Sequence, residues 1–157
     1  MLAAPGLHHL AMDVEALIAG HRARIREAVP EGTALVSGST LLGQFGGHDV
    51  DLVVLVPNVA DAAERLRRVY PPLYEDEWRD DWAAFRLAGP PQVDIVLTSP
   101  GTKGDAHHRR AWELILADDE LRAEYERLKA AGMDSAAKRA FFERVVARLV
   151  PGEQRQL

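Results

Sequence analysis

Apolar residues recur along the chain in blocks that predict one long helix followed by buried strands. The apolar positions of the first block repeat at helical spacing, and they are Val14, Leu17, Ile18, Ile25 and Val29. This spacing predicts a helix over roughly residues 12–29, ended by the Pro-Glu-Gly sequence that follows it. Short apolar runs then predict buried strands at 34–36 and 49–56, the second of which is apolar on both faces after its first residues.

The rest of the pattern predicts a further helix, a hairpin and a helical end. Asn58 is suited to cap a helix over about residues 59–69. Two strands, at 84–87 and 93–97, are joined by a Gly-Pro-Pro turn and therefore predict a hairpin. Beyond Gly104 we expect three helices, over residues 106–117, over residues 119–131, and from Asp134 or Ser135 to about Val150.

These elements predict an α+β fold (α/β in a looser scheme), with a mixed β-sheet flanked by helices and a helical C-terminal part. The sheet core is expected at about 33–100 and the C-terminal helices at about 105–150. A length of 157 residues predicts a single domain, 1–157. Apolar residues make up 47% and charged residues 27%, which is typical of a soluble globular protein.

Charge and cysteine content narrow the classes of function. The absence of cysteine excludes a disulfide framework and a thiolate zinc site. A formal net charge of −5 argues against a broad nucleic-acid footprint, so a small-molecule or protein partner is favoured. The first ten residues lack the basic and apolar regions of a signal peptide, and no stretch is long and apolar enough to span a membrane. We therefore expect a cytoplasmic protein.

The strongest chemical signal is a group of three aspartates on predicted strands. Asp49 and Asp51 are two residues apart at the start of a strand, so their side chains point to the same face. Carboxylates this close repel each other, and a bound divalent cation removes that repulsion. Asp94 lies between Val93 and Ile95, where an ionised carboxylate is costly unless it is paired or bound to a metal. The three aspartates predict a Mg²⁺ site, with Mn²⁺ as the alternative cation.

A Gly-Ser pair precedes these aspartates and suits phosphate binding. Gly38 has no side chain, so its backbone can approach a triphosphate closely. Ser39 offers a hydroxyl donor, and the amides around it can form an anion-binding nest. Nucleotidyl transfer needs mainly positioning and charge neutralisation, and this set of residues supplies both.

Several other features carry a plain structural interpretation beside a functional one. An Asp-x-Asp motif alone usually marks caps or solvated strand starts, and the His48-Asp49 pair resembles the all-helical HD phosphohydrolases only superficially. Trp78 and Trp82 suit either an acceptor pocket or an ordinary aromatic pair. A basic cluster suits either phosphate binding near a helix N-terminus or surface charge, and it comprises Lys103, His107, His108, Arg109 and Arg110.

The motif as a whole resembles the nucleotidyltransferase superfamily that includes DNA polymerase beta. The signature of that superfamily is Gly-Ser, about ten residues, Asp-x-Asp, and a distant third aspartate on a strand. Here its positions are Gly38, Ser39, Asp49, Asp51 and Asp94. The resemblance implies that the three aspartates hold metal, that Ser39 contacts the nucleotide phosphates, and that Asp94 helps to activate the attacking hydroxyl.

Within that superfamily the chain looks most like the GrpB family of small bacterial proteins, from about residue 35 to 149. The matching stretches are Gly38-Ser39-Thr40, Asp49–Val54, Phe85-Arg86-Leu87, Gly89-Pro90-Pro91, and Tyr125–Lys129 followed by Lys138 and Phe141. GrpB proteins usually carry histidines on the strand where this chain has Asp94. Lysines on the C-terminal helices of related enzymes reach the triphosphate, which makes Lys129 and Lys138 candidates beside the interpretation of a solvated helix face.

The function expected from these residues is transfer of a nucleoside monophosphate from a nucleoside triphosphate, such as ATP, to a hydroxyl of a small-molecule or protein acceptor. Two other interpretations stay open. One is an antitoxin-like or regulatory partner protein with this fold. The other is a module that binds metal and nucleotide without catalysing transfer.

Overall fold

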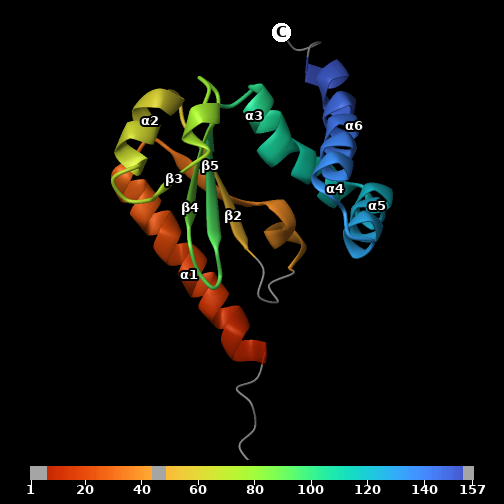
Figure 1. Cartoon of the computed structure of the whole chain (residues 1–157), viewed down its shortest axis with the longest axis horizontal. Coiled ribbons are helices and arrows are strands. Elements are labelled where there is room, and N and C mark those ends of the chain that lie inside the picture. The colour runs from red at the N-terminus through yellow and green to blue at the C-terminus, as the bar shows by residue number, and fades with distance from the viewer. Residues whose placement is uncertain (1–6, 44–48, 154–157) are drawn as a thin grey trace, which may run out of the picture. The chain divides into compact units, whose positions relative to one another are not determined.

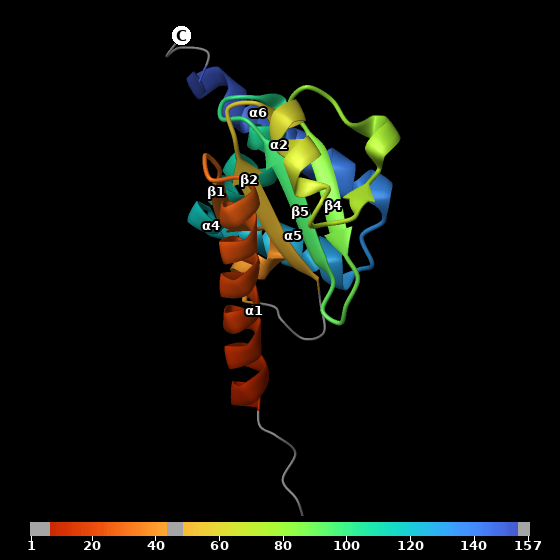
Figure 2. The ribbon, with the colours of Figure 1, turned by 90° about the vertical axis from the view of Figure 1, so that its left-hand side faces the viewer.

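A computed structural model describes residues 7–43 and 49–153. The chain forms two compact units, Met1–Pro100 and Gly101–Leu157 (Figures 1 and 2). Their boundary falls between the sheet core and the C-terminal helices expected from the sequence. Whether the two units behave as one domain stays a prediction. No helix among the described residues is long and apolar enough to cross a membrane.

The first unit is built on a five-stranded mixed sheet with strand order β1-β2-β5-β4-β3. The strands are β1 Thr33–Ser37, β2 Val50–Leu55, β3 Pro72–Leu73, β4 Ala83–Leu87 and β5 Val93–Thr98. β2 and β5 run parallel, whereas the other neighbouring pairs are antiparallel. The predicted α+β class and the hairpin between β4 and β5 are therefore confirmed.

Two helices of this unit, α1 Leu7–Ala28 and α2 Val59–Leu66, cover one face of the sheet (Figures 1 and 2). The core that they share with the strands includes fully buried Ile25, Leu66 and Phe85. Asn58 caps α2 as predicted, because its side-chain oxygen accepts a hydrogen bond from the Asp61 amide at 3.0 Å. α1 begins five residues before the predicted start, since no breaker interrupts the chain from Leu7 onwards.

Two short elements of this unit differ from the sequence-based prediction. The segment after β1, expected as a tight turn, is a 3₁₀ helix over Gly38–Leu42. β3 was not predicted, because a two-residue strand that begins with a proline carries no alternating pattern. It pairs with β4 through Pro72–Phe85 and Leu73–Ala84, at the edge of the sheet where proline is tolerated.

The second unit is helical, as expected. Its helices are α3 Lys103–Asp105, a π-helical segment Ala106–Arg110, α4 Ala111–Ala117, α5 Asp119–Ala130 and α6 Ser135–Glu153. Asp118 caps α5 as predicted, by accepting from the amides of Glu120 and Leu121. α6 continues past Pro151, where the sequence predicted its end. An aromatic cluster packs these helices together, with the rings of Trp112 and Tyr125 5.0 Å apart and nearly perpendicular.

Candidate active site

A row of polar residues crosses the sheet of the first unit. Ser37 on β1 pairs with Asp51 on β2, Asp51 with Asp94 on β5, and Asp94 with Arg86 on β4. Residues directly opposite each other in a sheet share a face. We call these four residues the polar row, and they present two carboxylates and a guanidinium side by side.

The polar row faces away from α1 and α2. The strand neighbours of its aspartates, such as Leu52 and Ile95, are fully buried in the core that the sheet shares with these helices. Because side chains alternate along a strand, the row must lie on the opposite face. The alternation that placed Asp51 and Asp94 from the sequence thus holds in the structure, and the register adds that they are direct neighbours.

Gly38 lies directly against the Asp51 carboxylate. Its φ of +63° is in the left-handed region, and a Cβ built on it would sit 2.3 Å from Asp51 Oδ2. Glycine suits this position for two reasons. A Cβ would collide with the carboxylate, and any other residue would be strained at this positive φ. Ser39 follows in the same 3₁₀ helix. The Gly-Ser pair and the second aspartate of the motif are therefore brought together.

Thr40 fixes the start of β2. Its buried hydroxyl accepts a hydrogen bond from the Asp51 amide at 3.0 Å and lies 3.3 Å from the Asp49 carbonyl oxygen, to which it donates. The two bonds hold the backbone on either side of Val50, between the two aspartates of the motif. From the sequence, Thr40 was only part of a matching stretch and had no predicted role.

Arg86 and Gln92 are partners of the aspartates that the sequence-based prediction missed. Arg86 donates from Nε to Asp94 Oδ1 at 2.7 Å and from a terminal nitrogen to Oδ2 at 3.1 Å. The hydrogen bonds to Asp94 raise the pKa of the Arg86 guanidinium above its ordinary value. The Gln92 amide nitrogen lies 2.9 Å from Asp49 Oδ2 and 3.3 Å from Asp94 Oδ1, so it donates between the two carboxylates.

The hairpin contains a signal that would have identified both residues. If the strands pair symmetrically around Pro90, residue 86 lies opposite residue 94, as the register shows. Arg86 interrupts an otherwise apolar strand at the position facing Asp94, and Gln92 lies two residues before Asp94 on the same face. The sequence-based prediction considered each aspartate within its own strand and therefore missed this cross-strand pairing.

The donor chemistry fits a divalent cation, but the arrangement is incomplete. Three carboxylates are the hard oxygen ligands that Mg²⁺ prefers. Within residues 7–43 and 49–153, however, no three His, Asp or Glu side chains are grouped so as to hold a metal ion. Both oxygens of Asp94 accept from Arg86, and Asp49 and Asp94 share the Gln92 amide. In a three-carboxylate site the cation would therefore compete with Arg86 for Asp94.

The predicted lysines lie on the second unit. Lys129 is half-buried on α5 and Lys138 is exposed on α6. Their contact with a triphosphate stays a prediction. In the basic cluster, Arg109 forms ion pairs with nearby residues of the same helical stretch. It donates to both oxygens of buried Asp105 at 2.6 Å and to Glu113 at 3.1 Å.

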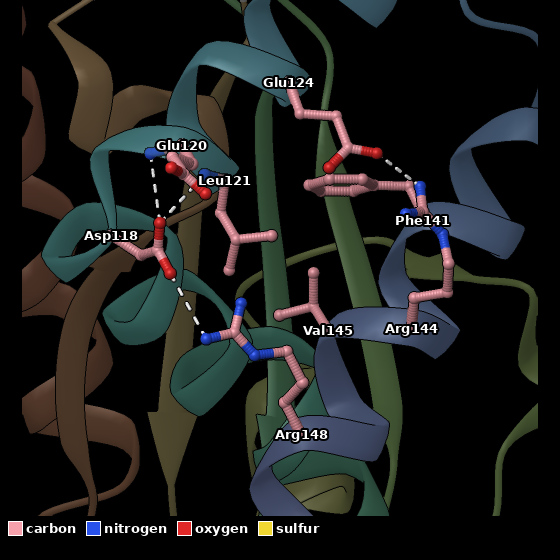
Figure 3. Close-up of a pocket in the computed structure, with 8 residues that line it drawn as sticks. All are labelled: Asp118, Glu120, Leu121, Glu124, Phe141, Arg144, Val145 and Arg148. Carbon is pink, nitrogen blue, oxygen red and sulfur yellow. Dashed lines mark hydrogen bonds and ion pairs between the residues drawn. The ribbon is translucent and has the colours of Figure 1, made fainter.

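A pocket of about 270 Å³ lies between α5 and α6 in the same unit (Figure 3). Its lining consists of Asp118, Glu120, Leu121, Glu124, Phe141, Arg144, Val145 and Arg148. Arg144 donates to Glu124 at 2.6 Å and Arg148 to Asp118 at 3.2 Å. Both arginines of the pocket thus have carboxylate partners in it, and neither predicted lysine lines it.

Trp78 is part of the packing of the first unit. Its ring nitrogen donates to the Leu73 carbonyl at 2.9 Å, and its ring lies 5.2 Å from that of Phe85. These contacts favour the ordinary aromatic interpretation for Trp78. Trp82 is half-buried immediately before β4, with the guanidinium of Arg79 5.8 Å from its ring centre.

No protein-family model and no curated protein matches the chain. Solved structures are similar to part of it, among them the following two. One, described as a cytoplasmic RNA terminal U-transferase, is 20% identical with a TM-score of 0.42, over 55% of this chain and 28% of its own. The other, Cid1 in complex with the UTP analog UMPNPP, is 14% identical with a TM-score of 0.41, over 71% and 34%.

The chain thus spans about a third or less of the length of either structure. At TM-scores below 0.5 this likeness decides nothing about the present chain. Membership of the GrpB family also stays a prediction. A function for this chain therefore rests on the geometry of the polar row.

Proposed function

We propose that the first unit carries a metal-dependent nucleotidyltransferase site. The observation that carries this proposal is the direct pairing of Asp51 with Asp94 on adjacent parallel strands, with the Gly38 backbone against the Asp51 carboxylate. Paired carboxylates that could share a cation, beside a Gly-Ser turn, suit nucleotidyl transfer, since its catalysis depends on positioning and charge neutralisation.

In the proposed reaction the oxygen of an acceptor hydroxyl attacks the α-phosphorus of a nucleoside triphosphate. The bond from that phosphorus to the oxygen bridging to the β-phosphate breaks, and pyrophosphate leaves. The acceptor proton passes to Asp94 or to solvent. The acceptor is a small molecule or a protein, in keeping with the net charge of −5.

Each predicted site residue has a defined part in this proposal. A divalent cation, Mg²⁺ or Mn²⁺, would be held by Asp49, Asp51 and Asp94 and would neutralise charge on the phosphoryl oxygens. The Ser39 hydroxyl and the amides around Gly38 bind the phosphates. Lys129 and Lys138 are proposed as additional phosphate contacts from the C-terminal helices.

The test is calorimetric titration of ATP, GTP, CTP and UTP, with and without Mg²⁺, on the wild type and on Asp51→Asn. We expect binding that depends on Mg²⁺ and weakens about tenfold or more in the variant, because a neutral amide is a poor ligand for a hard cation. Asp61→Asn is the matched control, since Asp61 is an exposed carboxylate on α2, which covers the opposite face of the sheet. If the wild type bound none of the four triphosphates, the proposal would be refuted.

A second candidate function is a nucleotide-binding or regulatory module that does not catalyse transfer. The observation in its favour is the Arg86–Asp94 pair, which occupies the third carboxylate. Incubation with α-labelled triphosphate and a cell extract separates the two candidates. Label attached to an acceptor by the wild type, but not by Asp51→Asn, supports the enzyme. Mg²⁺-dependent nucleotide binding without any labelled product supports the module.

A further inference from the structure

We propose that Arg86 is a positioning residue that competes with the divalent cation for Asp94 and, once displaced, binds the nucleotide phosphates. This inference rests on the proposed function and concerns the regulation of the same site. It would make cation binding and triphosphate binding depend on each other, because occupation of Asp94 by a cation frees the guanidinium for an anionic ligand.

The first step is the geometry of the pair. Arg86 engages Asp94 through two parallel hydrogen bonds, of 2.7 and 3.1 Å, one to each carboxylate oxygen. This bidentate arrangement is the strongest that a guanidinium makes with a carboxylate. A cation bound by Asp94 needs at least one of these oxygens, and a fixed guanidinium beside it would repel the cation. Guanidinium and cation therefore compete for the Asp94 carboxylate.

The second step is that Arg86 is able to leave. Its side chain is 37% exposed, whereas that of Asp94 is 21% exposed. Its aliphatic stem allows the guanidinium to turn away while β4 stays paired with β5. Within the polar row Asp94 then faces Asp51, the other carboxylate of the proposed site.

The third step concerns the released guanidinium. Its planar set of donors matches phosphate oxygens as well as it matches a carboxylate. Arg86 lies on β4, one strand from Asp94, two from Asp51 and three from β1, the strand that leads into Gly38. It would therefore be reached by a triphosphate that extends from Gly38 and Ser39 across Asp51 toward Asp94. A triphosphate would therefore stabilise the displaced form of Arg86 and so favour cation binding.

The experiment is calorimetric titration of MnCl₂ alone, and then of the four triphosphates with Mg²⁺, into the wild type and Arg86→Met. Methionine keeps an unbranched stem but lacks the charge. We expect Arg86→Met to bind Mn²⁺ about tenfold more tightly than the wild type without nucleotide. We expect the same variant to bind the Mg²⁺-triphosphate several-fold more weakly.

The matched control is Arg79→Met, which removes the same charge from an exposed arginine of the same unit that pairs with Asp81 at 3.4 Å. It should leave both affinities unchanged. In an Asp94→Asn background, Arg86→Met should no longer tighten Mn²⁺ binding, because the competition is lost. Arg86→Lys is a second variant, which keeps the positive charge but cannot form two parallel hydrogen bonds to one carboxylate. Its Mn²⁺ affinity should fall between that of the wild type and that of Arg86→Met.

A spectroscopic readout reports the displacement itself. The arginine Nε–H region of a ¹⁵N–¹H spectrum of the full chain should show a signal that Arg86→Met removes, and Mg²⁺ with a triphosphate should shift it. Equal Mn²⁺ affinities in the wild type, Arg86→Met and Arg79→Met would overturn this inference. If the triphosphates still bound in an Asp51-dependent manner, the proposed function would survive that result. If the wild type bound none of the triphosphates, both this inference and the proposed function would be refuted.

Discussion

Gly38 is the residue whose identity the candidate site constrains most closely. Gly38→Ala would place a Cβ 2.3 Å from Asp51 Oδ2 on a backbone with φ +63°. We expect a loss of about 2–3 kcal/mol in the free energy of unfolding, of which about 1–2 kcal/mol is left-handed strain. Because the carboxylate must move, Mg²⁺-dependent nucleotide binding should weaken as well. Urea unfolding and calorimetry measure the two effects.

Gly43 provides the control for this substitution. It has a similar φ of +72°, but a Cβ there would meet nothing within 4 Å. Gly43→Ala should therefore show the backbone strain alone, with nucleotide binding unchanged. If the two variants behaved alike in both measurements, the contact between Gly38 and Asp51 would contribute neither to stability nor to nucleotide binding.

The part of the site that the sequence revealed depends on periodicity along single strands. Asp51 and Asp94 were placed on strands by the apolar residues around them, and the structure puts them side by side. The roles of Thr40, Arg86 and Gln92 depend on which residues of separate elements meet. Such pairings are fixed by register and by the packing of the sheet, so a pattern within one strand does not show them, although the symmetry of the β4–β5 hairpin would have given the Arg86–Asp94 pair.

Elements with a strong apolar pattern were predicted, although the two longest helices, α1 and α6, extend beyond their predicted ends, and elements without such a pattern were missed. α5 and the β4–β5 hairpin lie within about a residue of their predicted bounds. β3 and the π-helical segment Ala106–Arg110 were missed. A two-residue strand exists only because β4 offers it hydrogen bonds. A π-helical segment of about one turn is too short to leave a period of its own in the sequence pattern.

His21 joins α1 to the segment after α2, and its titration should affect stability. Its Nδ1 lies 2.7 Å from the Tyr70 hydroxyl oxygen, and both side chains are buried. Burial, and then the charge of Arg24, lower the pKa of His21 below its ordinary value of 6.5. The folded chain therefore holds fewer protons than the unfolded chain just below pH 6.5. Neutral His21 therefore makes its whole contribution to the free energy of unfolding above pH 6.5, and this contribution is lost as the pH falls through the folded-state pKa.

Urea unfolding between pH 7.5 and 5 tests this expectation. His21→Gln, which does not titrate, should lose stability less steeply with falling pH than the wild type. Arg26→Gln is the control, because it changes an exposed residue of α1 and leaves the His21–Tyr70 hydrogen bond and Arg24 in place, so its pH dependence should resemble that of the wild type. Equal slopes for the wild type and His21→Gln would show that His21 does not cause the pH dependence.

The chain as a whole divides into Met1–Pro100 and Gly101–Leu157, yet we expect it to unfold in one transition. The second unit is shorter than the roughly 70–80 residues below which a single core rarely suffices for stability. Its core rests mainly on an aromatic cluster of Trp112, Tyr125, Phe141 and Phe142. A helical unit of that size is expected to depend on the remainder of the chain.

The distribution of tryptophan allows each unit to be followed in the full-length protein. Trp78 and Trp82 lie in the first unit and Trp112 in the second, so Trp112→Phe and the double variant Trp78→Phe/Trp82→Phe each report on one unit. In each variant, the urea midpoint from fluorescence should coincide with the midpoint from far-ultraviolet circular dichroism, as a two-state transition requires. If Trp112 fluorescence changed at lower urea than the dichroism of the same variant, the C-terminal helices would be a separate domain. In that case the lysines proposed to reach the triphosphate would belong to a domain that is able to unfold while the polar row stays folded.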